Sequence, residues 1–417
     1  MSASFCIGLI FGWGPFVKIL ESEGIAAAAC GLDSERPCSA QKVFFSLVYT
    51  LSSCSLAFGS LPAGLLLDVA GPVVASVLAG SLICAGNLLL AWLPASGPAS
   101  AFIVPFVLMG SGGTLTALTA FKIAACFPAA ESILITAINA IFDVSATVPL
   151  AFYYLYSRFG RPRAQIFTTF AIYVGGLFAA WAALWHGHYA TFLQRPPERL
   201  TDLTTTSEEM PISSTRPPDE AFAPLDSPGL TLRAVLRSKQ FVVATLWFVF
   251  HQLRANLYLG SAADMLRSYG DADGRYMQYL TGMLSLALFF IPLISASADR
   301  LGVAGSMQAV TLLAAAHAVS CLVPSLRFQL VSFFIFTLLR AATFSVSAML
   351  VARIFGFARL GTVYGIMQCA GALINLFIPL ITAAVLTRNG GSWVPVFWGL
   401  LLVCAPQLGI VSWATRR

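Results

Sequence analysis

Repeated apolar runs, each about long enough to cross a lipid bilayer, constrain this chain more than any other feature of its sequence. Hydrophobic residues make up 58% of the 417 residues and charged residues only 10%, whereas a soluble domain carries roughly 25% charged residues. In the bilayer core the backbone polar groups must be bonded internally, and runs of this length therefore form helices. We expect an all-α, multi-pass integral membrane protein of the plasma membrane or an intracellular membrane.

Twelve such runs can be delimited, six on each side of one polar interruption. The second run ends near residue 67, after which Gly71-Pro72 turns the chain into a third run that ends near residue 93. The sixth ends near residue 186. The first run is short, and we interpret it as the latter part of a first helix that the sequence does not contain in full. Apart from the third and sixth runs, the expected helices cover residues 4–20, 44–67, 101–127, 132–156, 241–259, 277–298, 303–323, 329–351, 362–386 and 394–413.

The polar interruption covers residues 187–239 and is rich in charged residues, Pro, Ser and Thr. Such a composition cannot bury enough apolar surface to offset its ordering entropy, which favours a flexible linker. The predicted organisation is therefore a six-helix half at 1–186, a linker at 187–239 and a second six-helix half at 240–417. Because the span count is even, the linker and both termini are expected on one side of the membrane.

Two cysteines decide which side that is. Lys and Arg are nearly equally distributed between the two sides, so the positive-inside rule does not choose an orientation. Cys30 and Cys38 lie in a polar loop without a neighbouring His, on the side opposite the linker. A disulfide is predicted if that loop faces an oxidising compartment. We therefore place the linker in the cytoplasm.

Polar residues inside the apolar runs are candidate functional groups, because an ionisable group at mid-bilayer costs about 2.5–3.5 kcal/mol on insertion scales. Asp143 and Asn139 share one face of the fifth run. Either Arg340 or Arg254 could pair with Asp143 and so join the two halves, which is the structural alternative to a role in binding. Gln368 and Asn375, seven residues apart, share a face of the eleventh run.

A short internal echo relates the two halves. The second run ends in Pro62…Asp68 and the eighth in Pro292…Asp299-Arg300, at corresponding places. We expect Asp68, Asp299 and Arg300 to act at helix ends beside short turns, as gating residues.

The sequence contains no catalytic or nucleotide-binding motif. HExxH, GxSxG in a strand–helix context, a P-loop and paired CxxC motifs are all lacking, so we expect neither an enzyme nor an ATP-driven pump. The sequence also lacks a selectivity-filter repeat, so we do not expect a channel. We expect no metal and no cofactor. The basic residues are scattered, which argues against a nucleic-acid partner.

Several stretches resemble solute carrier family 43 within the major facilitator superfamily, and they are similar to apicomplexan amino acid transporters. They are Phe11-Gly12-Trp13, Lys18 to Gly24, Cys30 to Lys42, Phe45 to Leu51, Pro62-Ala63-Gly64 with Asp68, Gly110 to Gly113, Ile138 to Asp143 with Ser145, Leu257 to Ser261, Leu339-Arg340 and Tyr364-Gly365. The resemblance implies the major facilitator superfamily fold and sodium-independent facilitated movement of a small solute.

The expected function is a facilitative carrier of large neutral amino acids, monomeric, with one site between the halves. Asp143 and Asn139 would hold the ammonium, and Arg340 or Arg254 the carboxylate. Trp13, Phe142 and Tyr258 would line an apolar pocket. One alternative is a purine nucleobase transporter that uses Asn139, Gln368 and Asn375 with a stacking aromatic. Another is a transport-inactive membrane sensor or scaffold that docks a partner through the linker.

Overall fold

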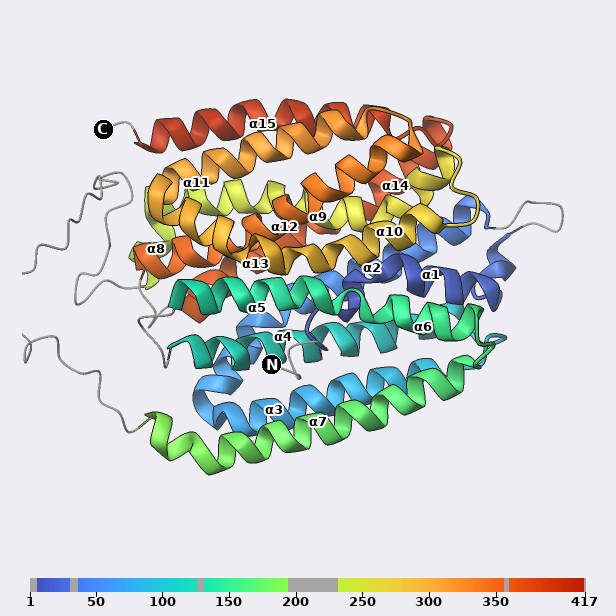
Figure 1. Cartoon of the computed structure of the whole chain (residues 1–417), viewed down its shortest axis with the longest axis horizontal. Coiled ribbons are helices and arrows are strands. Elements are labelled where there is room, and N and C mark those ends of the chain that lie inside the picture. The colour runs from blue at the N-terminus through green and yellow to red at the C-terminus, as the bar shows by residue number, and fades with distance from the viewer. Residues whose placement is uncertain (1–5, 31–36, 126–130, 194–231, 356–359, 416–417) are drawn as a thin grey trace, which may run out of the picture.

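The computed structural model describes residues 6–30, 37–125, 131–193, 232–355 and 360–415, and its regular structure there is helical (Figure 1). Long helices lie side by side along the longest axis of the molecule. Helices from before residue 193 occupy one flank of the bundle and helices from after residue 232 the other. An all-helical bundle is what the apolar runs predict.

The first flank is the N-terminal half. Its elements are η2 (Leu9–Phe11), α1 (Trp13–Ser22), η3 (Ala27–Ala29), α2 (Ser39–Phe58), α3 (Ser60–Trp92), η4 (Ala99–Phe102), α4 (Ile103–Ala125), α5 (Glu131–Ser145), α6 (Val148–Ser157) and α7 (Arg163–Leu193). The second flank is the C-terminal half. It contains α8 (Leu232–Arg237), α9 (Lys239–Ser268), α10 (Arg275–Met283), η7 (Leu284–Phe290), α11 (Ile291–Cys321), α12 (Leu326–Phe355), α13 (Leu360–Asn375), α14 (Ile378–Arg388) and α15 (Val394–Thr415).

Ten segments of the described residues are long and apolar enough to cross a membrane. They coincide with ten of the twelve expected runs. The other two runs correspond to α1, which has 10 residues, and to α9, which has 30 residues but carries the polar string from His251 to Tyr258. Most of the predicted linker, residues 194–231, lies outside the described residues. Within the described part, α7 continues past the predicted end near residue 186 to Leu193.

The bundle has two distinct ends. The last turn of α7, the short α8 and the last turn of α15 lie at one end, which we call the linker end (Figure 1). The connection between α1 and α2 lies at the opposite end, and there Cys30 and Cys38 form a disulfide. We call this the disulfide end. The structure thus joins the two cysteines that the sequence singles out.

The echo between the halves corresponds to a pair of sharp corners. α3 is two helices that meet at Gly71, with φ 77° and ψ 172°. α11 is likewise two helices that meet at Gly302, with φ 69° and ψ −171°. Each glycine follows the aspartate of the echo, Asp68 or Asp299, by three residues. This backbone region is accessible almost only to glycine, so the two halves use the same local device to reverse the chain.

A second pair of breaks interrupts the helices that carry the central polar residues. α5 ends at Ser145 and α6 begins at Val148, with Pro149 in its first turn. α13 ends at Asn375 and α14 begins at Ile378, again followed by a proline in the first turn. Proline suits this position because its missing N–H would have no intrahelical acceptor there. The matching breaks add a second internal resemblance between the halves.

One long seam between the halves runs along α2 to the first residue of α3, and we call it the α2 seam. Ser46 Oγ lies 3.1 Å from Thr382 Oγ1, the Cys54 thiol donates to the Ala372 carbonyl at 3.3 Å, and the Ser60 hydroxyl lies 3.4 Å from the Gly365 carbonyl. Two of these hydroxyls also donate to a carbonyl of their own half. Ser60 donates to the Ala57 carbonyl and Thr382 to the Ile378 carbonyl.

We expect Gly71→Ala and Gly302→Ala each to destabilise the protein by about 1–3 kcal/mol, since alanine is strained at these backbone angles. The measurement is the thermal unfolding midpoint of the purified protein in detergent. Gly64→Ala is the control, because Gly64 lies in α3 and a Cβ there meets no atom within 4 Å. Equal midpoints for all three variants would contradict the assignment of Gly71 and Gly302 as obligatory corners.

Candidate functional site

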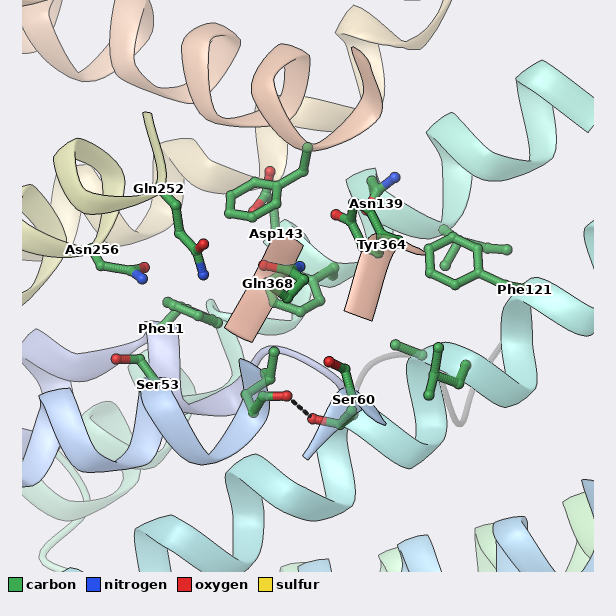
Figure 2. Close-up of a pocket in the computed structure, with 17 residues that line it drawn as sticks. Phe11, Ser53, Ser60, Phe121, Asn139, Asp143, Gln252, Asn256, Tyr364 and Gln368 are labelled. Atoms are coloured by element: carbon green, nitrogen blue, oxygen red, sulfur yellow. Dashed lines mark hydrogen bonds between the residues drawn. The ribbon is translucent and has the colours of Figure 1, made fainter. Parts of the chain in front are cut away.

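A partly enclosed cavity lies between the two halves (Figure 2). Its volume is about 60 Å³, and a water needs about 10–15 Å³ on such a scale, so the cavity accommodates a few waters. The lining combines phenyl rings with neutral hydroxyl and amide groups. The lining residues are Phe11, Ser53, Leu56, Ser60, Thr114, Ala117, Leu118, Phe121, Ile138, Asn139, Phe142, Asp143, Gln252, Asn256, Phe344, Tyr364 and Gln368.

Small residues bring the start of the chain against α5 and so place Phe11 in the cavity wall. A Cβ at Gly8 would lie 2.4 Å from the Phe142 carbonyl oxygen, and one at Gly12 would lie 2.3 Å from the Ala146 carbonyl oxygen. The Gly8 N–H donates to Ser145 Oγ at 2.6 Å. Glycine is required at both positions because any side chain would separate the two segments.

An ion pair joins the halves beside the cavity. Arg340 Nε on α12 donates to Asp143 Oδ1 on α5 at 2.6 Å. The side chain of Arg340 is 0% exposed and that of Asp143 is 3% exposed. Of the two arginines that the sequence offers as partners for Asp143, the structure selects Arg340.

Aromatic rings enclose the guanidinium group. Arg340 Cζ lies 4.3 Å from the ring centroid of Phe11, 5.2 Å from that of Phe344 and 5.5 Å from that of Phe142. A cation within about 6 Å of a ring face is attracted by the ring quadrupole. Asp143 lines the cavity whereas Arg340 does not. A solute in the cavity therefore meets the carboxylate side of a neutralised pair and an aromatic wall in front of the cation.

Arg254 lies in another environment. Its guanidinium donates to the carbonyls of Ala314 and Leu400 at 2.8 and 2.7 Å and to the Cys404 sulfur at 3.0 Å. These contacts connect α9 to α11 and α15 within the C-terminal half. The structure therefore does not place Arg254 at the cavity, and the carboxylate-binding role expected from its depth in the sequence is not supported by its position.

Three further candidates also lie away from the cavity lining. Trp13 packs against Tyr49 and Phe106. Tyr258 packs against His317 and Phe336, within the C-terminal half. Asn375 is fully buried at the end of α13. By contrast, Asn139, Phe142, Asp143 and Gln368 all line the cavity.

Sequence reasoning missed Gln252 and Asn256, which belong to the same polar string as Arg254. They are four residues apart and both line the cavity. The usable signal was their shared helical face, from which Arg254 is rotated away. Figure 2 shows both amides on the side of Ser53 and Phe11, across the cavity from Asn139 and Tyr364.

Ion pairs between the halves close the disulfide end. Arg267 on α9 lies 3.2 Å from Glu21 on α1, and Lys42 on α2 lies 3.8 Å from Asp264 on α9. The side chains of Asp68 and Asp299, which we expected to act in gating, lie outside the described ones, and Arg300 is exposed. These two ion pairs therefore lie at the end opposite the residues that the echo indicated.

Comparison with known proteins defines the fold. A solved structure of the major facilitator superfamily proton:xylose symporter XylE, bound to 6-bromo-6-deoxy-D-glucose, matches with a TM-score of 0.65 and 14% sequence identity, over 99% of this chain and 93% of that one. The chain therefore has the major facilitator superfamily fold. With its apolar helices, this makes it an integral multi-pass membrane protein. No protein-family model matches the chain.

The chain is similar in sequence to several curated proteins, of which two are described here. The chain is 22% identical to Equilibrative nucleobase transporter 1 of Bos taurus over 461 aligned residues, which cover 97% of this chain and 91% of that protein. It is 27% identical to Protein FMP42 of Saccharomyces cerevisiae over 180 residues, which cover 41% of this chain and 34% of that protein.

Removing one member of the central pair should destabilise the protein more than removing both. Asp143→Asn or Arg340→Gln leaves one buried charge unpaired, at a cost of about 3–5 kcal/mol. The double variant Asp143→Asn/Arg340→Gln leaves no charge and should recover much of that loss. The thermal unfolding midpoint measures the effect, and strictly additive losses in the double variant would contradict a buried pair.

Proposed function

We propose that the chain is a facilitative membrane carrier for a small, planar, uncharged solute of the nucleobase class. The solute would bind in the cavity between the halves, and its access would alternate between the two ends. The ion pairs at the disulfide end and the central Asp143–Arg340 pair would form the closure on one side. The α2 seam would let one half move against the other.

The observation that carries the substrate class is the neutralised central pair. Asp143 and Arg340 compensate each other, and phenyl rings shield the guanidinium. The remaining polar groups of the lining are neutral amides and hydroxyls. Such a site binds an uncharged heterocycle by hydrogen bonds and stacking without separating buried charges. The name of the Bos taurus relative supports the same substrate class.

Large neutral amino acids are the second candidate. Asp143 lines the cavity and carries a carboxylate that suits an ammonium group. To use it, the amino acid would have to separate Asp143 from Arg340, and its carboxylate would have to displace the rings that cover Arg340. Exchanging one buried pair for another costs desolvation twice, which is why we rank this substrate second.

Membership of solute carrier family 43, the two halves at 1–186 and 240–417 and the tether at 187–239 remain part of this proposal. The disulfide supports an orientation. Because disulfides persist in oxidising compartments, the disulfide end would face outward and the linker end the cytoplasm of a plasma-membrane protein. If the protein were instead a transport-inactive scaffold, the linker would be the segment that docks a partner.

Uptake of radiolabelled adenine and of radiolabelled leucine by cells expressing the chain tests the proposal. We expect saturable adenine uptake that excess unlabelled leucine does not reduce. Saturable leucine uptake without adenine uptake would assign the chain to amino acids. Uptake of neither would contradict a carrier for these solutes. Deleting residues 201–226 should leave the uptake rate unchanged if the linker is only a tether.

The double variant Asp143→Asn/Arg340→Gln separates the two substrate classes. It keeps the site neutral, so adenine uptake should change by less than about tenfold, which corresponds to about 1.4 kcal/mol. A zwitterion would lose a charge-assisted contact worth about 1.5–3 kcal/mol at each end, or on the order of 100-fold or more in total. The initial uptake rate, normalised to surface protein, is the measurement, and a loss of that size for adenine would contradict the uncharged-solute site.

A further inference from the structure

We propose that Thr50 and Asn375 set the balance between the two states of the carrier, because their polar atoms have no partner in the α2 seam while the disulfide end is closed. This inference rests on the alternating access of the proposed function and not on its substrate class. Thr50 belongs to α2, and Asn375 is the last residue of α13. The two residues therefore belong to different halves of the protein.

The contacts of the α2 seam follow one antiparallel register. From Ser46 to Cys54 the residue numbers of α2 rise, while those of their partners fall from Thr382 to Ala372. Since α2 begins near the disulfide end, the Ser46 contact lies closer to that end than the Cys54 contact (Figure 1). Motion of the halves that opens the disulfide end would separate this part of the seam first.

Thr50 and Asn375 both lie between these two contacts. Thr50 is four residues from each of the two α2 residues in the contacts, so it shares their helical face. Asn375 lies three residues after Ala372, a spacing that also keeps one helical face. The register therefore places both polar residues at about one level of the seam.

Neither residue has a hydrogen-bond partner for its side chain in the described part of the chain. Both are fully buried, and Thr50 Oγ1 and the Nδ2 and Oδ1 atoms of Asn375 make no hydrogen bond with described residues. Beside them Cys54, Ala57 and Ala372 form one buried cluster across the seam. A buried polar atom without a partner costs free energy that water or a partner would recover. The closed seam therefore carries this cost.

The corresponding break in the N-terminal half contains a polar residue whose side chain is bonded. Ser145 is the last residue of α5, as Asn375 is the last residue of α13. Ser145 Oγ accepts from the Gly8 N–H and donates to the Phe142 carbonyl, both at 2.6 Å. A polar side chain at such a break can thus be satisfied. The missing bonds of Asn375 therefore follow from its position in the seam.

These unpartnered atoms oppose the ion pairs of the disulfide end. The ion pairs hold the two halves together there and favour the closed state. When they break and the seam separates, water reaches Thr50 and Asn375 and the cost of their burial is recovered. The population of each state follows its free energy, so the opposing contributions keep both states populated.

Matched isosteric substitutions test this balance. Thr50→Val and Thr382→Val are the same change at buried positions on facing helices, 0% and 1% exposed. Thr50 Oγ1 has no partner in the described residues, whereas Thr382 Oγ1 donates to the Ile378 carbonyl and lies 3.1 Å from Ser46 Oγ. Thr50→Val should raise the thermal unfolding midpoint and Thr382→Val should lower it. Asn375→Leu removes two unpartnered atoms and should raise it as well.

Alkylation of Cys54 by N-ethylmaleimide in unsolubilised membranes measures the population of the open state. The Cys54 thiol donates to a carbonyl across the seam and is 2% exposed, so it reacts after the seam separates. We expect Thr50→Val and Asn375→Leu each to slow this alkylation about fivefold or more, and Thr382→Val to accelerate it about fivefold. Fivefold corresponds to about 1 kcal/mol. Peptide mass spectrometry measures the rate at each cysteine.

Cys321 is the reference thiol, because it is fully buried in the interior of the C-terminal half and reports unfolding. Equal Cys54 rates in the wild type, Thr50→Val and Thr382→Val would overturn the inference even if the unfolding midpoints differ. The unpartnered atoms would then cost the same in both states. A Cys54 that stays unreactive in the wild type would overturn it too, since the second state would not be populated.

The alkylation needs no solute, so it separates this inference from the proposed substrate class. If neither adenine nor leucine is taken up but the Cys54 rates shift in opposite directions, the proposed substrates fail and this inference stands. If adenine is taken up and the Cys54 rates do not differ, the nucleobase carrier stands and the roles of Thr50 and Asn375 fail.

Discussion

The buried pair of Asp143 and Arg340 is the interaction on which the rest of this bundle depends. Each ion costs several kcal/mol to remove from water, and only a close partner recovers that cost. The partners lie on α5 and α12, in different halves, so the charges hold the halves together at the centre. The phenyl rings around Arg340 exclude water and come from both halves as well. Electrostatics and packing therefore converge at one point of the interface.

The chemistry of the cavity follows from this pair. The charges compensate each other and the other polar groups of the lining are neutral, so the proposed uncharged solute would bind without breaking the ion pair. Phe11 serves both purposes, since it covers Arg340 and lines the cavity. Its place depends on the glycines at 8 and 12, which admit the first segment against α5. A short, partly irregular first helix is thus compatible with a precise position for its aromatic residue.

The sequence alone predicted the helical class, ten of the spans and the candidate pair of Asp143 with Arg340, because apolar run length and the cost of buried charge are local properties of a sequence. It did not separate Arg340 from Arg254, since both lie at similar depth and only helix rotation distinguishes them. It also missed Gln252 and Asn256, which line the cavity from α9 and meet residues of other helices there. The fit between distant segments leaves no local pattern in a sequence. Burying a neutral amide also costs less free energy than burying a charge, so an amide stands out less among apolar residues.

The α2 seam has a consequence for the energy of motion. Ser60 contacts the Gly365 carbonyl across the seam and Thr382 contacts Ser46, while each of the two hydroxyls also has an acceptor in its own half. When the halves slide, these groups lose a neighbour but are not left without a partner. At these two positions, motion of the halves therefore leaves no hydroxyl without an acceptor. In the proposed carrier, the ion pairs at the disulfide end and at the centre would be the contacts that have to break when the halves move.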